Sequence, residues 1–85
     1  MKMSRNEIFD KLKEIIVSAD ETIPQRFPEL TEQTRVLEDL GFTSIGMLFM
    51  AVSVEEVFQI KLDNINIWSL HVIGDVISMI EGKLS

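Results

Sequence analysis

The chain contains no cysteine, so neither a disulfide nor a thiolate metal site can form. It has one histidine, His71, which leaves too few nitrogen and sulfur ligands for a zinc site. Basic residues are also few, because 8 Lys and Arg stand against 14 Asp and Glu, giving a net charge of −6. Binding to nucleic acid or to an anionic membrane needs a basic surface, so we expect neither as a partner.

Long apolar segments are missing as well. The longest apolar run, residues 45–54, includes Gly46 and Ser53 and is too short to cross a bilayer, so no membrane insertion is expected. The charged stretch at residues 1–7 is not followed by an apolar segment, which gives no sign of a signal peptide. These features predict a cytoplasmic protein.

The common catalytic and ion-binding motifs are absent. Phe42 stands where a nucleophile elbow, G-x-S-x-G, requires its first glycine, and no phosphate-binding glycine loop is present. A calcium loop fails after Asp63, where isoleucines replace the oxygen ligands. A triad of Ser44, His71 and Asp75 can be drawn, but no motif links them, and a small hydrolase stays only as an alternative. We predict that the chain is not an enzyme.

The sequence does contain enough apolar residues to form a core. The chain is 46% hydrophobic and 26% charged, which is typical of one folded domain, here residues 1–85. Ser4 and Glu7 form a capping box, which predicts the start of a first helix. A stripe at helical spacing follows and fades after residue 19; it consists of Ile8, Leu12, Ile15, Ile16 and Ala19.

Residues 21–36 show no sustained period and contain Pro24 and Pro28, so they predict a long ordered loop. Apolar residues that could fasten it to the core are Ile23, Phe27, Leu30, Val36 and Leu37. A second helix is expected from Ser44 to Phe58 or Ile60, capped by Thr43 or Ser44. Its predicted core stripe is Ile45, Leu48, Ala51, Val54 and Phe58, with Met50 and Val52 at the margins.

Two more helical segments complete the prediction. Asp63 could cap a helix of one or two turns, and Ser69 could cap a last helix that ends at Gly82. The core face of that last helix would be Leu70, Ile73, Val76, Ile77 and Ile80. The expected fold is therefore all-α, a small four-helix bundle with three main helices and one short helix.

Ser44 is the residue with the clearest chemical meaning. It follows a glycine turn and stands at the expected start of a helix, where unpaired N–H groups and a partial positive charge favour a phosphate. At these residues the sequence resembles the acyl carrier protein family, including peptidyl carrier domains. The family's hallmark is Leu-x-x-Leu-Gly-x-Asp-Ser-Leu, and it is matched here by Leu37, Leu40, Gly41, Ser44 and Ile45.

The resemblance covers nearly the whole chain and implies an acyl-carrier-like bundle. It implies that Ser44 carries a covalent 4′-phosphopantetheine arm, placed there by a phosphopantetheinyl transferase that uses coenzyme A. Acyl groups would be held on that arm as thioesters and passed among acyl-processing synthase enzymes of fatty-acid, polyketide or related synthesis. The protein would act as a monomer, and the imported thiol fits a chain without cysteine.

The sequence departs from the family pattern at two places. Thr43 replaces the aspartate before the serine, which keeps a capping oxygen but loses a charge that aids transferase recognition. Acids expected along the second helix are delayed to Glu55 and Glu56. The predicted partner-recognition residues are Thr43, Ile45, Met47, Phe49, Val52, Glu55 and Glu56. Two alternatives stay open. One is that some of these side chains belong to the core instead of a partner surface. The other is that the chain is an unmodified carrier-like module that only binds a partner.

Overall fold

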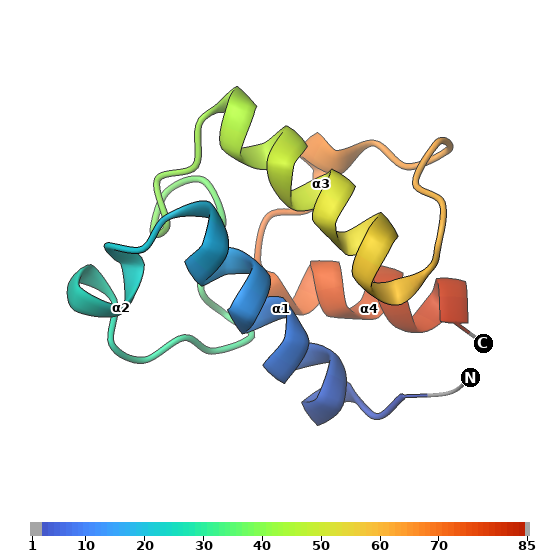
Figure 1. Ribbon diagram of the computed structural model, residues 1–85, viewed down its shortest axis with the longest axis horizontal. Helices are drawn as coiled ribbons and strands as arrows, with labels where there is room; N and C mark the ends of the chain where they lie inside the picture. Colours follow the sequence, from blue (N-terminus) through green and yellow to red (C-terminus); the bar gives the residue numbers. More distant parts are fainter. Residues whose placement is uncertain (1–2, 85) are drawn as a thin grey trace.

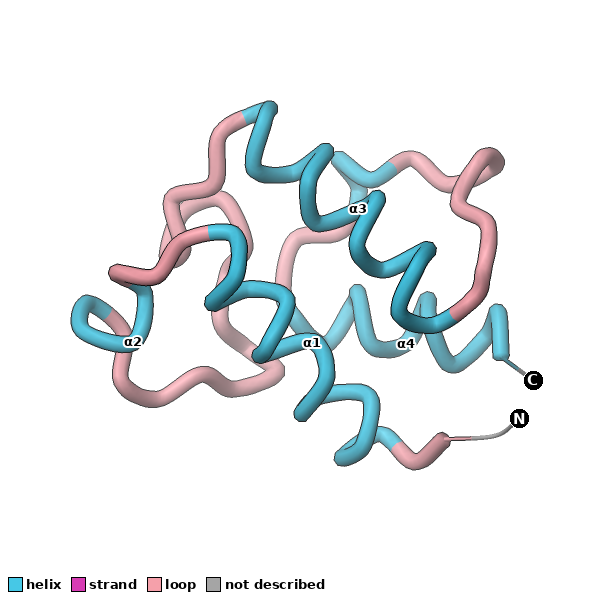
Figure 2. The backbone as a smooth tube through the Cα atoms, viewed as in Figure 1, coloured by secondary structure: helices cyan, strands magenta, loops and turns pink. Residues whose placement is uncertain are grey.

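A computed structural model describes residues 3–84 as a bundle of helices (Figure 1). The helices are α1 (Arg5–Ala19), α2 (Ile23–Arg26), α3 (Ser44–Phe58), the 3-10 helix η1 (Ile67–Ser69) and α4 (Ile73–Leu84). No strand occurs among the described residues, and loops make up the remainder (Figure 2). The predicted all-α class with three main helices is confirmed.

The first helix forms as the sequence predicts. Ser4 Oγ accepts a hydrogen bond from the Glu7 N–H at 3.2 Å, and Glu7 Oε1 accepts one from the Ser4 N–H at 2.9 Å. This capping box satisfies two of the backbone donors that a helix start leaves unpaired. All of the predicted stripe except the half-buried Ala19 lies in the core.

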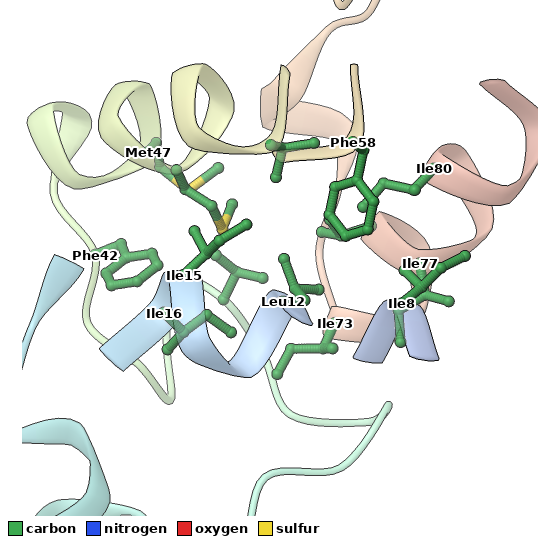
Figure 3. Close-up of a cluster of buried hydrophobic side chains, with 14 of the residues drawn as sticks. Ile8, Leu12, Ile15, Ile16, Phe42, Met47, Phe58, Ile73, Ile77 and Ile80 are labelled. Atoms are coloured by element: carbon green, nitrogen blue, oxygen red, sulfur yellow. The ribbon is translucent and has the colours of Figure 1, made fainter. Parts of the chain in front are cut away.

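The core lies where α1, α3 and α4 meet, and Figure 3 shows apolar side chains from all three helices converging there. Helix α1 packs against both α3 and α4, while α3 crosses above them in Figure 1. Phe42, from the segment that precedes α3, adds an aromatic ring at one end of this cluster. The first turn of α3 is therefore held by the core immediately beside it.

The buried face of α3 differs from the predicted stripe. Ile45 and Leu48 were expected in the core, but they are 80% and 57% exposed. Met47 and Met50 take their place, followed by the predicted Val54 and Phe58. Helix α3 is apolar on nearly all sides, so hydrophobic spacing does not fix which side faces inward.

The segment from residue 21 to residue 36 is a loop apart from α2. The prediction of loop throughout was wrong at Ile23–Arg26, because Pro24 lies in the first turn of that short helix, where its missing N–H costs nothing. Ile23 and Val36 are buried as expected, and Phe27 and Leu30 are half-buried. Leu37 instead lies exposed on the surface.

This loop pairs with the segment that leads into α4. The Val36 N–H donates to the His71 carbonyl at 2.9 Å, the Ile73 N–H to the Thr34 carbonyl at 2.9 Å, and the Gly74 N–H to the Glu32 carbonyl at 2.8 Å. Gly74 permits the close approach, since a Cβ there would lie 3.1 Å from the Glu32 carbonyl oxygen. The chain before Ser44 is thus tied to the start of α4.

Arg5 adds a second tie between the same parts. Its guanidinium pairs with the carboxylates of Glu32 in the loop and Glu81 in α4, and donates to Ser78 Oγ at 3.1 Å. The hydrogen bonds from Arg5 hold the pKa of Glu32 below its ordinary value. The charged atoms are partly exposed, so this network fixes geometry more than it adds stability.

The predicted helix caps at Asp63 and Ser69 were both wrong. Asn66, and not Asp63, caps the short helix, which is η1, by accepting from the Trp68 N–H at 3.0 Å. Ser69 ends η1 and does not begin α4. Helix α4 continues through Gly82 to Leu84, and its apolar face is Ile73, Val76, Ile77 and Ile80. Leu70 lies in the connection before it and is half-buried.

Candidate functional site

A tight turn delivers the chain to Ser44. The Gly41 N–H donates to the Leu37 carbonyl at 3.0 Å, and Gly41 adopts a φ of +71°, in the left-handed region that side chains disfavour. A Cβ at Gly41 would meet nothing within 4 Å, so the backbone conformation, not crowding, requires the glycine. Leu40 and Phe42 on either side are buried and hold the turn in place.

Thr43 is the N-cap of α3, which confirms one of the two predicted capping residues, Thr43 or Ser44. Its backbone is extended, and its hydroxyl accepts a hydrogen bond from the Gly46 N–H at 3.3 Å. Ser44 is the first residue of α3 and its side chain is exposed. Among residues 3–84 no side chain or backbone group hydrogen-bonds the Ser44 hydroxyl, so this oxygen is free to react.

Charge near Ser44 is low. The first turn of α3 contains no acidic residue, so its positive helix end is not neutralised from within the helix. Asp20 lies beside the same turn but is committed elsewhere: it accepts from the Thr22 hydroxyl and N–H and pairs with Arg26 at 2.9 Å. These hydrogen bonds, those from Thr22 above all, lower the pKa of Asp20. Asp20 therefore does not replace the charge that Thr43 lacks.

A hollow of about 310 Å³ opens beside the turn. It is lined by Ala19 and Asp20 from the end of α1 and by the residues on both sides of Ser44, namely Gly41, Phe42, Thr43, Ile45, Gly46 and Phe49. A Cβ at Gly46 would lie 3.4 Å from the Phe42 ring, which is ordinary van der Waals contact. Asp20 could not be predicted from the sequence as a neighbour of this site, because its position depends on how α1 ends.

An apolar strip covers the outer surface of α3. It consists of Ile45, Leu48, Phe49 and Val52, all exposed, and is called the outer face below. Three of these residues were predicted to meet a partner, whereas Leu48 was missed because it was assigned to the core. Met47 was also predicted to face a partner, and that prediction is wrong, because its side chain is fully buried between α1 and α3.

The two acidic residues of α3 have different environments. Glu56 is exposed, while Glu55 is half-buried and its carboxylate accepts a hydrogen bond from the Leu62 N–H at 2.8 Å. Glu55 therefore has a structural task in holding the following loop. Glu56 lies one turn beyond Val52 and adds a negative charge at the end of the outer face.

The drawn triad does not assemble. Asp75 Oδ2 accepts from the backbone N–H groups of His71 at 3.0 Å and Val72 at 3.2 Å, so its carboxylate caps the start of α4. No hydrogen bond joins the side chains of Ser44, His71 and Asp75 in the part of the chain that the structure describes. The arrangement offers no base to the Ser44 hydroxyl, which a hydrolase would need.

Residues 3–84 contain no cluster of three or more His, Cys, Asp or Glu side chains that could hold a metal ion. Within the same range no helix is both long enough and apolar enough to cross a membrane.

Comparison with known proteins places the chain in a family. No protein-family model matches it. It is 33% identical to an acyl carrier protein of Thermotoga maritima, over 95% of this chain and 96% of that protein. It is 31% identical to an acyl carrier protein of Wolinella succinogenes, over 87% and 93%. An acyl carrier protein of Coprothermobacter proteolyticus is 29% identical, over 96% of each chain. With such similarity along almost its whole length, and with a free serine at the start of α3, the chain belongs to the acyl carrier protein family.

Proposed function

We propose that Ser44 carries a 4′-phosphopantetheine arm and that residues 1–85 serve as one acyl carrier domain. The observation that carries this proposal is the position of Ser44 as an exposed, unbonded hydroxyl at the positive end of a helix of fifteen residues. A phosphodiester there would face N–H groups of the first turn and no acidic side chain of α3. The residues present fit the group.

Attachment needs a separate transferase. The Ser44 oxygen would form a bond to the phosphorus that carries pantetheine, and its proton would pass to a base of the transferase. The pyrophosphate bond of coenzyme A would break, and adenosine 3′,5′-bisphosphate would leave. When bound, the arm supplies the thiol on which acyl groups travel as thioesters between the acyl-processing synthases of fatty-acid, polyketide or related synthesis. The chain itself performs no catalysis in this proposal and acts as a cytoplasmic monomer.

The outer face is the proposed docking surface for the transferase and the synthases. Ile45, Phe49 and Val52 form an exposed apolar strip beside Ser44, with Thr43 at one end and Glu56 at the other. Exposed apolar strips of this kind mark protein contacts. A strip without charged side chains provides little long-range steering of a partner. Glu55 belongs to this surface through its half-exposed carboxylate, although it also bonds the following loop.

The experiment is a modification assay with intact mass as the readout. Wild-type protein and Ser44→Ala are incubated with coenzyme A, Mg²⁺ and a broad-specificity phosphopantetheinyl transferase. We expect one added arm on the wild type and none on Ser44→Ala. No added mass on the wild type, even with the transferase of the source organism, would contradict the proposal.

A second candidate is an unmodified carrier-like module that binds a partner only through the outer face. It is favoured by Thr43, which removes the charge that aids the transferase, and by the apolar character of α3. The same assay separates the two. In this second case Ser44→Ala would bind its partner as well as the wild type, whereas Val52→Glu would lose binding.

A further inference from the structure

The Arg26 guanidinium joins three segments beside the turn that leads to Ser44. Its Nε donates to Thr22 Oγ1 at 3.2 Å, and its Nη2 donates to Asp20 Oδ2 at 2.9 Å and to the Leu40 carbonyl at 3.4 Å. Arg26 is the last residue of α2, and Asp20 is the C-cap of α1. One side chain therefore connects the end of α1 and the end of α2 to the turn that precedes α3.

The peptide between Leu40 and Gly41 is held at both of its polar atoms. The Gly41 N–H donates to the Leu37 carbonyl at 3.0 Å, and in the described part of the chain only Arg26 donates to the Leu40 carbonyl. Gly41 has a φ of +71°, and glycine adopts positive and negative φ about equally, so the residue type alone does not select this conformation. Rotating the peptide plane would break both bonds and change the direction in which the chain enters α3.

The backbone of Arg26 is itself fixed. Ile23, at the start of α2, is buried in the core. The N–H groups of Arg26 and Phe27 donate to the carbonyls of Thr22 and Ile23 at 3.1 and 2.7 Å. The guanidinium offers several N–H groups in a rigid planar fork, so one side chain serves three acceptors at once. A lysine ammonium at this position would lack that fixed geometry.

The contacts of Arg26 restrain a local conformation more than they stabilise the bundle. The Arg26 side chain is 48% exposed, and an ion pair as exposed as this one contributes little to the free energy of unfolding. Asp20 also cancels the charge of Arg26, so the pair provides little attraction for a partner. The bond to the Leu40 carbonyl, in contrast, acts on a single peptide four residues before Ser44.

We infer that Arg26 is a positioning residue for arm attachment, because its fork holds the peptide before Gly41 and thereby presents Ser44 to the transferase. This inference rests on the proposed modification of Ser44. Without the bond to the Leu40 carbonyl, a fraction of the molecules would hold the turn in another conformation. The transferase would then bind only the remaining fraction, which raises KM for the carrier and leaves kcat unchanged.

The test compares the initial rates of arm attachment in the wild type, Arg26→Gln, Arg26→Lys and Arg35→Gln. Arg35 is the matched control, because it forms exposed ion pairs with Glu38 and Asp39 but does not donate to the Leu40 carbonyl. We expect KM for the carrier to rise about three- to tenfold in both Arg26 variants, with kcat within about twofold of the wild type. Arg35→Gln should match the wild type.

The variant Arg26→Lys separates geometry from charge, since it retains the net charge of −6. Wild-type kinetics in Arg26→Lys would show that only the charge matters and would overturn the inference. A rise of KM in Arg35→Gln as large as in Arg26→Gln would overturn it as well, because any lost cation would then have the same effect.

Amide hydrogen exchange of Gly41 reports on the turn in the unmodified protein. We expect the Gly41 N–H to exchange about three- to tenfold faster in Arg26→Gln than in the wild type or Arg35→Gln, while amides in the middle of α1 keep their protection. Equal exchange of the Gly41 N–H in all three proteins would overturn the inference, whatever the kinetics show.

The outcomes for the two proposals are distinct. If intact mass shows no arm on the wild type, the proposed function fails and the role of Arg26 in attachment falls with it. If the arm is attached but the Arg26 variants keep the KM of the wild type, the inference about Arg26 alone is overturned.

Discussion

Thr43 is the position at which stability and modification can be separated. Its hydroxyl caps α3 through a 3.3 Å bond from Gly46, and α3 has no acidic residue in its first turn. Thr43→Ala removes the cap and should lower the free energy of unfolding by about 1 kcal/mol. For a domain of this size that corresponds to about 4–8 °C in Tm.

Thr43→Asp keeps the capping oxygen and adds a negative charge at the positive end of α3. The added interaction should raise the free energy of unfolding by about 0.3–1 kcal/mol at low ionic strength. The net charge of −6 opposes part of this gain, since one more negative charge adds to the overall repulsion. We therefore expect the order Thr43→Asp, wild type, Thr43→Ala in stability.

Urea unfolding at low salt and at about 1 M salt measures both contributions. Salt screens the charge term of Thr43→Asp but leaves the cap bond, so the gain of Thr43→Asp should shrink while the loss in Thr43→Ala persists. An unchanged stability of Thr43→Ala would refute the capping role. A gain in Thr43→Asp that does not respond to salt would refute the helix-charge argument.

The prediction for Thr43 also concerns the rate at which the transferase attaches the arm to Ser44. If charge before the serine helps the transferase, Thr43→Asp should be modified faster than the wild type, and Thr43→Asn, which caps without charge, should not. Equal initial rates for all three proteins would show that the outer face alone governs recognition.

Three further predictions concern the bundle. Leu12→Ala should lower the free energy of unfolding, measured in urea, by about 2–5 kcal/mol because Leu12 is fully buried. Leu48→Ala, on the outer face, should lower it by less than about 0.5 kcal/mol. Equal losses in the two variants would contradict the assigned register of α3. Gly74→Ala should destabilise by about 1–3 kcal/mol, since the new Cβ would lie 3.1 Å from the Glu32 carbonyl oxygen, and an unchanged unfolding midpoint would argue against that close approach. Arg5 lowers the pKa of Glu32 below its ordinary value of 4.5, so the stabilisation from this pair is present above that pH and is lost as the pH falls through the lowered pKa. Arg5→Met should therefore flatten the acid limb of unfolding free energy against pH, and an acid limb as steep as that of the wild type would show that other carboxylates set it.

The first helix could be predicted from the sequence because its signals agree. A capping box marks its start, and most positions off its apolar stripe are polar or charged, so one face is marked for burial. The Gly41 turn and the start of α3 at Ser44 could be predicted for the same reason, since a glycine and a capping hydroxyl mark them. The position of Ser44 as the first residue of α3 was therefore predictable from local chemistry.

The phase of α3 could not be predicted, because no polar side chain stands between Ser44 and Ser53 to mark its outer side. The sets that begin with Ile45 and with Met47 both have helical spacing, and packing against α1 selects the second. Helix α4 was placed too early for a different reason: Ser69 is a good cap by type, but the backbone of the preceding residues forms η1. The capping carboxylate belongs to Asp75, the third residue of α4, but Val72 before that helix is not a Ser or Thr, so the sequence does not show a complete capping box.

The pairing of the long loop with the start of α4 makes distant parts of the chain one cooperative unit. The bonds at Val36 and Ile73 link the loop that leads to the Ser44 turn to a helix that begins 37 residues after Val36. Opening α4 must therefore also release the loop, whereas fraying the first turn of α3 need not. Ser44 thus lies outside this paired region, and we expect a visiting enzyme to loosen the first turn of α3 without unfolding the bundle.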